Sequence, residues 1–184
     1  MILLANYTSV YRSKLLINTI ENWVKNDQKV LDVGCGNAVV TRELQKYFKI
    51  DFVGCDVLDY RKEMIKFVKM KSEDTLPFRE KQFDSTIFTD VLHHTSKDTQ
   101  LKLIKESLRI SNKVILFELL PTIRGYLADF SVNKIHNRKM SIPFTYRKLE
   151  DWKNVFRSFN VSYKTKLVKS PWWYPFSHVA FLLY

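Results

Sequence analysis

The chain has 184 residues, of which 46% are hydrophobic, and a formal net charge of +11. This length and apolar content suffice for one domain with its own core, so we expect a single domain over residues 1–184 rather than two. No apolar run approaches the roughly 20 residues that span a bilayer, and the N-terminus lacks the basic flank and cleavage site of a signal peptide. We therefore expect no membrane span and a cytoplasmic location.

The positive charge is concentrated in the last third of the chain. Between Lys134 and Lys169, ten basic residues stand against two acidic ones. Such an excess is typical of proteins that bind an anionic partner. A lysine-rich solvated surface gives the same pattern, so both interpretations stay open at this point.

Two helices and a strand are predicted for the first fifty residues. Apolar residues recur at helical spacing over residues 8–25 and predict an amphipathic helix. The apolar residues Val30, Leu31 and Val33 predict a buried strand. Asn37 is a helix-capping residue type, and the spacing of the apolar residues after it predicts a second helix to about Tyr47.

A glycine turn separates this strand from the second helix. It contains Gly34 and Gly36, two of the four glycines of the chain. Because glycine adopts positive φ and has no Cβ, a ligand can contact the main chain there. Parallel α/β sheets place such a turn at the carboxyl end of a strand to bind nucleotide-like ligands, and Asp32 adds a carboxylate at that end. On its own the pattern fits an ordinary strand-to-helix turn equally well.

The second predicted strand supports the ligand-site interpretation. It covers residues 50–56 and ends on Asp56, 24 residues after Asp32. In dinucleotide folds, a carboxylate at a similar offset accepts hydrogen bonds from the ribose hydroxyls. Only a short stretch separates Asp56 from the next apolar run, residues 65–70, so we expect a short helix or none between them.

Strands and helices continue to alternate up to about residue 120. Residues 83–90 predict a strand, and Thr95 with Asp98 predicts a capping box before a helix. Residues 113–120 predict a fifth strand. This alternation is typical of a parallel sheet with right-handed crossovers, so the residues alone predict an α/β fold.

The final third is less regular. Residues 121–146 are expected to be loop and short helix, followed by a helix around residues 149–159. Two late segments, residues 160–166 and 178–184, predict a terminal strand pair.

Neither the cysteines nor the histidines have the spacing of a metal site or of a disulfide framework. Cys35 and Cys55 lie in or beside predicted buried strands, without Cys-x-x-Cys spacing. His93 and His94 are adjacent rather than four residues apart on a helix. We therefore predict no disulfide and no metal site.

Taken together, these motifs resemble those of the class I S-adenosylmethionine-dependent methyltransferases, in particular the methyltransferase type 11 and ubiquinone-biosynthesis group. Residues 30–37 are similar to the first motif of the family and Asp56 to its ribose-binding acid. Residues 76–78 with 83–84, and residues 90–94, are similar to its third and fourth motifs. The similarity runs in order over about residues 10–120.

The resemblance implies a fold and a cofactor. The fold class is α/β, a three-layer Rossmann-like sandwich with a mostly parallel seven-stranded sheet and an antiparallel C-terminal strand pair. Residues 1–120 would form the cofactor-binding part, and residues 121–184 would supply the substrate-side elements and the last strands. The implied cofactor is S-adenosyl-L-methionine.

The resemblance also implies roles for matching residues. Gly34 and Gly36 would approach the methionine part of the cofactor, and Asp32 would order its amino end. Asp56 would hold the ribose, with Val57 against the adenine.

The third motif departs from the pattern of the family. Ser72 and Glu73 stand where an acid followed by a small residue is usual, so the adenine contact is expected to pass to Glu73 or Asp74. The complete set of expected cofactor-binding residues is Arg12, Asp32, Gly34, Cys35, Gly36, Asn37, Asp56, Val57, Ser72, Glu73, Asp74, Asp90 and Val91.

Methyl transfer requires little chemistry from the protein, because the sulfonium already activates the methyl group. The protein mainly aligns an oxygen, nitrogen or carbon nucleophile and excludes water. Where the nucleophile must lose a proton, His94 or His93 is the expected base. His93 has the competing interpretation of a residue that packs against and caps the next helix, and His136 is a further candidate base.

The acceptor is expected to be a small or medium-sized anionic molecule. An alternative is an RNA methyltransferase whose residues 134–169 bind phosphates, and no DNA partner is expected. A third interpretation is a catalytically silent cofactor-binding partner of another methyltransferase, and the chain is expected to be a monomer or weak dimer. The expected border of the acceptor site comprises Tyr7, Tyr11, Arg12, Arg124, Asp129, Asn133, His136 and the aromatic residues 171–176.

Overall fold

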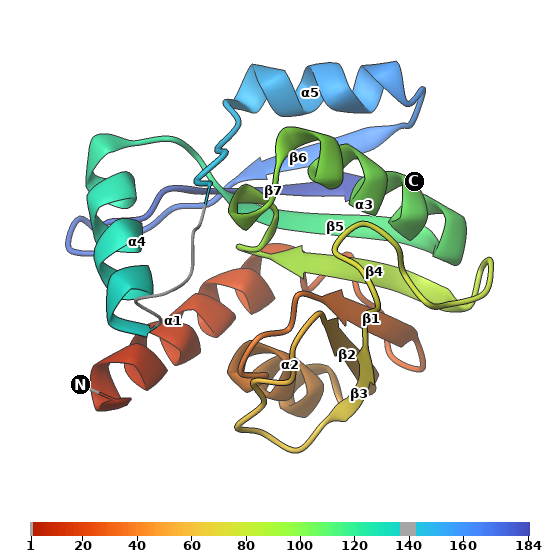
Figure 1. Cartoon of the computed structure of the whole chain (residues 1–184), viewed down its shortest axis with the longest axis horizontal. Helices are drawn as coiled ribbons and strands as arrows, with labels where there is room; N and C mark the ends of the chain where they lie inside the picture. The colour runs from red at the N-terminus through yellow and green to blue at the C-terminus, as the bar shows by residue number, and fades with distance from the viewer. Residues whose placement is uncertain (1, 137–142) are drawn as a thin grey trace.

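The structure, a computed structural model, describes residues 2–136 and 143–184, and the side chains of residues 9–131 and 143–184 within them. One twisted sheet carries helices on both faces (Figure 1). The strands are β1 (Lys29–Val33), β2 (Asp51–Asp56), β3 (Lys66–Lys69), β4 (Phe83–Thr89), β5 (Ser111–Leu119), β6 (Tyr163–Leu167) and β7 (His178–Leu183). The helices are α1 (Ile2–Ile20), α2 (Val39–Phe48), α3 (Lys97–Ile110), α4 (Ile123–His136) and α5 (Leu149–Ser158), with a 3₁₀ turn η1 (Leu92–His94).

The sheet has seven strands in the order β3-β2-β1-β4-β5-β7-β6. The pairs among β1 to β5 are parallel, whereas β7 runs antiparallel to both β5 and β6. The predicted fold class is therefore confirmed, including the antiparallel C-terminal pair. Because β1, β2, β4 and β5 are parallel, their carboxyl ends lie along one edge of the sheet, where α/β folds bind ligands.

Two hydrophobic layers hold the helices on the sheet. On one face, α3 and α5 pack against the strands through side chains such as Ile104 and Phe156. On the other face, α1 and α2 do so through side chains such as Leu16 and Leu44. Successive residues of a strand point to opposite faces, so Val30 joins the second layer and Leu31 the first.

Two predicted helix boundaries are corrected. The first helix covers Ile2–Ile20 rather than residues 8–25, because Trp23 and Val24 are buried by a turn that hydrogen-bonds to the Ile20 carbonyl and not by the helix itself. In the segment predicted as loop and short helix, α4 runs for 14 residues.

Two predicted helix caps are also corrected. Ser96, not Thr95, caps α3, and its Oγ accepts the Thr99 N–H at 3.1 Å. The cap position of α2 is Ala38 rather than Asn37, although the Asn37 side chain accepts the Val39 N–H at 3.2 Å.

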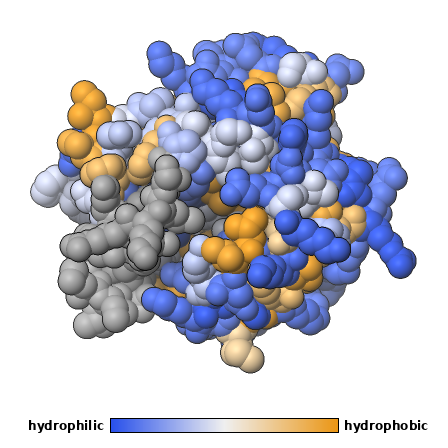
Figure 2. All heavy atoms as spheres, viewed as in Figure 1, coloured by the Kyte–Doolittle hydropathy of each residue, from blue (hydrophilic) through white to orange (hydrophobic). Residues whose placement is uncertain are grey.

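Helix α4 lies beyond the carboxyl ends of the central strands and exposes apolar side chains. Ile123 is 83% exposed and Leu127 is 59% exposed, and Figure 2 shows hydrophobic atoms at the upper left, where Figure 1 places this helix. Because its apolar residues are not confined to one buried face, the helix lacks the periodic pattern from which helices are predicted. Within the described residues, no helix combines the length and apolar character that a membrane span requires.

Candidate active site

A cavity of about 400 Å³ opens at the carboxyl ends of the central strands. Its walls come from the glycine turn after β1, the end of β2, the segment between β4 and α3, and parts of α1 and α4. The structure brings most of the predicted site residues together in these walls: Arg12, Asp32, Gly34, Cys35, Gly36, Asn37, Asp56, Val57, Glu73, Asp90, Val91 and His94.

The two glycines of the turn have different reasons to lack a side chain. Both have positive φ, 72° at Gly34 and 53° at Gly36. A Cβ on Gly34 would lie 2.2 Å from Cγ2 of Val91, so Gly34 allows close packing of the turn on the chain after β4. A Cβ on Gly36 would meet no described atom within 4 Å, which leaves that backbone open to the cavity.

Asp32 is a buried carboxylate at the base of the cavity. It is only 2% exposed, and its Oδ2 accepts the Thr41 hydroxyl at 2.6 Å. Burial is the main cause that raises the pKa of Asp32 to about 7, and nearby Asp56 adds to the effect. The Thr41 hydrogen bond and the positive charge of Arg12 oppose the increase.

Asp56 binds the glycine turn from the end of β2. Its Oδ2 accepts the Gly36 N–H at 3.0 Å, and its Oδ1 accepts the Val57 N–H at 2.7 Å. Burial raises the pKa of Asp56, although these backbone hydrogen bonds lower it in part. The carboxylate is thus fixed beside the turn at the cavity wall.

Asp90 is held in an unusual backbone conformation, with φ at 52°. Its Oδ2 lies 3.1 Å from Nε2 of His178 and 3.4 Å from a guanidinium nitrogen of Arg12. Burial would raise the pKa of Asp90, but His178, Arg12 and His93 outweigh burial and lower it to about 2. Asp90 is therefore a permanent anion in the cavity wall.

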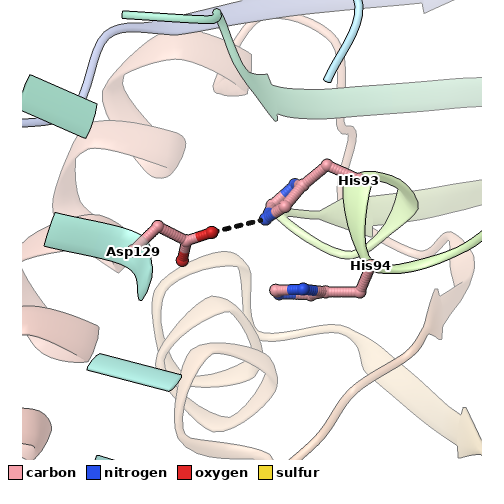
Figure 3. Close-up of side chains that lie close together, drawn as sticks. All are labelled: His93, His94 and Asp129. Atoms are coloured by element: carbon pink, nitrogen blue, oxygen red, sulfur yellow. Dashed lines mark ion pairs between the residues drawn. The ribbon is translucent and has the colours of Figure 1, made fainter. Parts of the chain in front are cut away.

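His93 lies between two carboxylates, and Figure 3 shows one of them, that of Asp129. Its Nδ1 is 2.8 Å from Oε2 of Glu118, and its Nε2 is 3.4 Å from Oδ2 of Asp129. The ring of Tyr146 stacks on it with 5.0 Å between centroids. Burial lowers the pKa of His93, but the two carboxylates outweigh this effect and raise the pKa to about 10. His93 therefore carries a proton at neutral pH. Its side chain is not among those that line the cavity.

His94 lines the cavity beside Asp129. Its Nδ1 is buried without a hydrogen-bond partner among the described residues. Burial and the positive charge of His93 lower the pKa of His94, so its ring is neutral near pH 7. Of the three predicted catalytic histidines, His94 reaches the cavity and His93 does not, while the side chain of His136 lies outside the described residues.

The third-motif residues divide between the cavity and the surface. Glu73 lines the cavity, whereas Ser72 and Asp74 do not. The Ser72 hydroxyl donates to Asp74 at 3.0 Å, and Asp74 pairs with Lys102 at 2.9 Å. These partners hold Asp74 at the surface, which leaves Glu73 as the acid of this segment that faces the cavity.

Several residues of the site were not predicted from the sequence, among them Glu118 and Tyr146. Glu118 gives a sequence signal, because it is an acid within the apolar second half of a strand, and it is buried to 1% exposure. Its Oε1 accepts the N–H groups of Val91 and Leu92. Tyr146 donates its hydroxyl to Asp129 at 2.5 Å, and it gave no signal because it lies in an irregular segment.

The strand order and the position of the cavity give a Rossmann-like fold, which the solved methyltransferase structures described below share. Residues 31–113 match the model of the family described as "Methyltransferase domain". This segment contains the glycine turn, Asp56 and the histidine pair. The predicted resemblance to the S-adenosylmethionine-dependent methyltransferases is confirmed, and S-adenosylmethionine is the cofactor of that family.

Solved structures of this class share the fold. A methyltransferase from Methanosarcina mazei is 15% identical, with a TM-score of 0.67 over 90% of this chain and 95% of the other. Magnesium protoporphyrin IX methyltransferase from Synechocystis PCC 6803, solved with bound SAH, is 16% identical, with a TM-score of 0.64 over 96% and 83%.

A third similar structure comes from a two-protein assembly. A chain of the complex between the Haloferax volcanii Trm112 methyltransferase activator and its candidate methyltransferase is 12% identical, with a TM-score of 0.67 over 95% of this chain and 96% of the other. At these identities the likeness concerns the fold alone. The search of curated proteins found no match.

Proposed function

We propose that the protein is an enzyme that transfers the methyl group of S-adenosylmethionine to an acceptor that enters the cavity beside His94. The observation that supports this most directly is the wall shared by Gly36, Asp32 and Asp56, which combines an open backbone with one buried and one half-buried carboxylate. A cofactor that carries an ammonium group and a ribose diol requires these groups. Asp32 orders the amino end, and Asp56 accepts the ribose hydroxyls.

The acceptor side lies where η1 and α4 meet. His94 and Asp129 line the cavity there, together with Tyr174 and Phe176 from the segment before β7. His94 is thus the histidine that contacts the acceptor, and His93 orients the segment from behind. Since the sulfonium activates the methyl group, alignment of the acceptor and exclusion of water are the main tasks of these walls.

An RNA acceptor has less support than a small anionic one. Within the basic segment 134–169, the described residue Arg147 is 9% exposed and donates to Gln100 at 2.6 Å. Lys166 donates to the Thr19 carbonyl at 2.7 Å. These groups take part in the fold, so they add little to a phosphate-binding surface.

The acceptor class can be identified by transfer of a labelled methyl group. The protein is incubated with methyl-labelled S-adenosylmethionine and a cell extract, which is then separated into RNA, protein, lipid and small-molecule fractions. We expect label in the small-molecule fraction, and much less label there for Asp56→Ala at a cofactor concentration below the dissociation constant of that variant. Label confined to RNA would select the alternative acceptor, and no transfer to any fraction would contradict an enzymatic role.

Asp56→Ala is expected to weaken S-adenosylmethionine binding about 10- to 100-fold. The variant loses charge-assisted hydrogen bonding to the ribose, and the range given corresponds to the net loss of one such bond, about 1.5–3 kcal/mol. Isothermal titration calorimetry measures the effect, with Asp59→Ala as the matched control because Asp59 is an exposed acid three residues away that pairs with Arg61. Equal affinity of wild type and Asp56→Ala would disprove the ribose assignment.

Cofactor binding is also expected to depend on pH through Asp32. Only the ionised carboxylate attracts the ammonium group, so with a pKa of about 7 the affinity falls as the pH decreases from about 8 to about 6, by about tenfold for one titrating group. Calorimetry across this range measures the slope. In Asp32→Asn the affinity should be low at each pH, and a slope equal to that of wild type would assign the effect to another group.

A further inference from the structure

Three side chains that can bind a metal ion converge at the acceptor side of the cavity. His93 and His94 come from η1, and Asp129 comes from α4, 35 residues further along the chain than His94. One ligand atom from each residue lies within 4.8 Å of the others. Figure 3 shows the two rings and the carboxylate directed toward a common space.

The ring nitrogens available in this cluster are buried. The His93 side chain is 2% exposed, and its Nε2 has only the 3.4 Å ion-pair contact with Asp129. Nδ1 of His94 is buried and has no hydrogen-bond partner in the described part of the chain. A polar nitrogen that is buried without a hydrogen-bond partner costs free energy. Such atoms therefore indicate that a bound group, such as an ion, interacts with them.

The surroundings of the cluster are those of a metal-binding histidine. Metal-bound histidines usually donate the other ring N–H to a carboxylate, which fixes the ring. Here Glu118 accepts from Nδ1 of His93 at 2.8 Å and also holds the backbone of η1 through the N–H groups of Val91 and Leu92. The Tyr146 hydroxyl fixes Asp129 in the same way. Two of the three ligand groups, those of His93 and Asp129, are therefore held in place before any ion binds.

We propose that His93, His94 and Asp129 form a binding site for a divalent transition metal ion. Two imidazole nitrogens and one carboxylate oxygen suit zinc, cobalt, iron or manganese, whereas magnesium and calcium prefer oxygen ligands alone. The ion takes the place of the proton on Nε2 of His93, which leaves to solvent. Adjacent histidines do not have the spacing of a helical metal site, so the sequence pattern alone does not indicate one. The fold supplies the third ligand, Asp129.

The proposed ion would face the acceptor. His94 and Asp129 line the cavity, so the coordination positions that the protein leaves open are directed into it. If the proposed function holds, an oxygen of the acceptor binds there and is oriented toward the methyl group. The acceptor class is then a molecule with a hydroxyl or carboxylate oxygen, in agreement with an anionic acceptor.

Zinc binding can be tested without the cofactor. The full-length protein is treated with a chelator, dialysed and titrated with Zn²⁺ in a calorimeter. We expect one ion per chain and at least tenfold weaker binding for His94→Gln and for Asp129→Asn. Asp74→Asn is the matched acidic control, because Asp74 lies outside the cavity and pairs with Lys102, and it should bind as wild type does.

A spectroscopic measurement identifies the ligands independently. Co²⁺ bound by two nitrogens and an oxygen in a four- or five-coordinate site gives visible d–d absorption, which should be absent from His94→Gln. Two outcomes would overturn the proposal: no Zn²⁺ binding by the wild type at micromolar concentrations, or wild-type affinity in both cluster variants. Loss of Zn²⁺ binding in Cys35→Ser alone would assign the ion to the thiols instead and also overturn it. S-adenosylmethionine calorimetry on the metal-free protein tests the proposed function separately.

Discussion

Replacing Glu118 with glutamine is expected to lower the free energy of unfolding by about 3–5 kcal/mol, the usual cost of removing one partner from a buried ion pair. The carboxylate is 1% exposed and accepts three hydrogen bonds, from the N–H groups of Val91 and Leu92 and from Nδ1 of His93. The amide of glutamine keeps the size of the side chain but removes the charge and turns one acceptor into a donor. The protonated His93 ring then keeps only one carboxylate neighbour.

Equilibrium unfolding in urea measures this loss. The control is Glu150→Gln, because Glu150 is an exposed residue whose carboxylate pairs with Lys153 at the surface. Surface pairs of this kind contribute little to stability, so the control should unfold at nearly the wild-type urea concentration. If Glu118→Gln also unfolded at the wild-type urea concentration, the carboxylate could not be the group that holds η1 in place.

Gly34→Ala is expected to abolish measurable cofactor binding and to destabilise the protein by about 2–5 kcal/mol, from the left-handed backbone and the overpacking together. The added Cβ would lie 2.2 Å from Cγ2 of Val91, so the turn or the segment after β4 must move. Either movement displaces backbone groups that line the cavity. Calorimetry and urea unfolding together measure both effects.

Two further variants separate the steric effect from the backbone effect. Gly36→Ala has the same backbone strain but no clash, so it should be destabilised less, by about 1–2 kcal/mol, while its Cβ still occupies cavity space. In Gly34→Ala, the additional change Val91→Ala removes the clashing methyl groups and should restore part of the stability. No recovery in this double variant would show that the contact with Val91 is not the cause.

The cofactor side of the site could be predicted from the sequence, because its groups lie next to each other along the chain. Gly34 and Gly36 follow a strand directly, and Asp56 ends the next one. In a parallel sheet, carboxyl ends that are predicted strand by strand necessarily meet at one edge. The order of the motifs along the chain was therefore sufficient to predict where the cofactor side of the cavity lies.

The acceptor side could not be predicted in the same way. Glu118 and His93 are 25 residues apart in sequence, and their contact depends on the pairing of β4 with β5. Asp129 lies on α4, whose large apolar side chains within the described residues are exposed and give no period from which to place it. The N-cap of α3 was predicted wrongly at Thr95 for a local reason. Ser96, one residue later, is an equally good capping residue.

The segment between β4 and α3 joins the two halves of the site. Val91 packs against Gly34 on the cofactor side, and His94, three residues later, lines the acceptor side. Glu118 ties the intervening backbone into a single unit. A ligand that shifts Val91 is therefore expected to shift His94 as well. If the cofactor changes the affinity for the acceptor by some factor, the acceptor must change the affinity for the cofactor by the same factor, because binding at two sites is thermodynamically reciprocal.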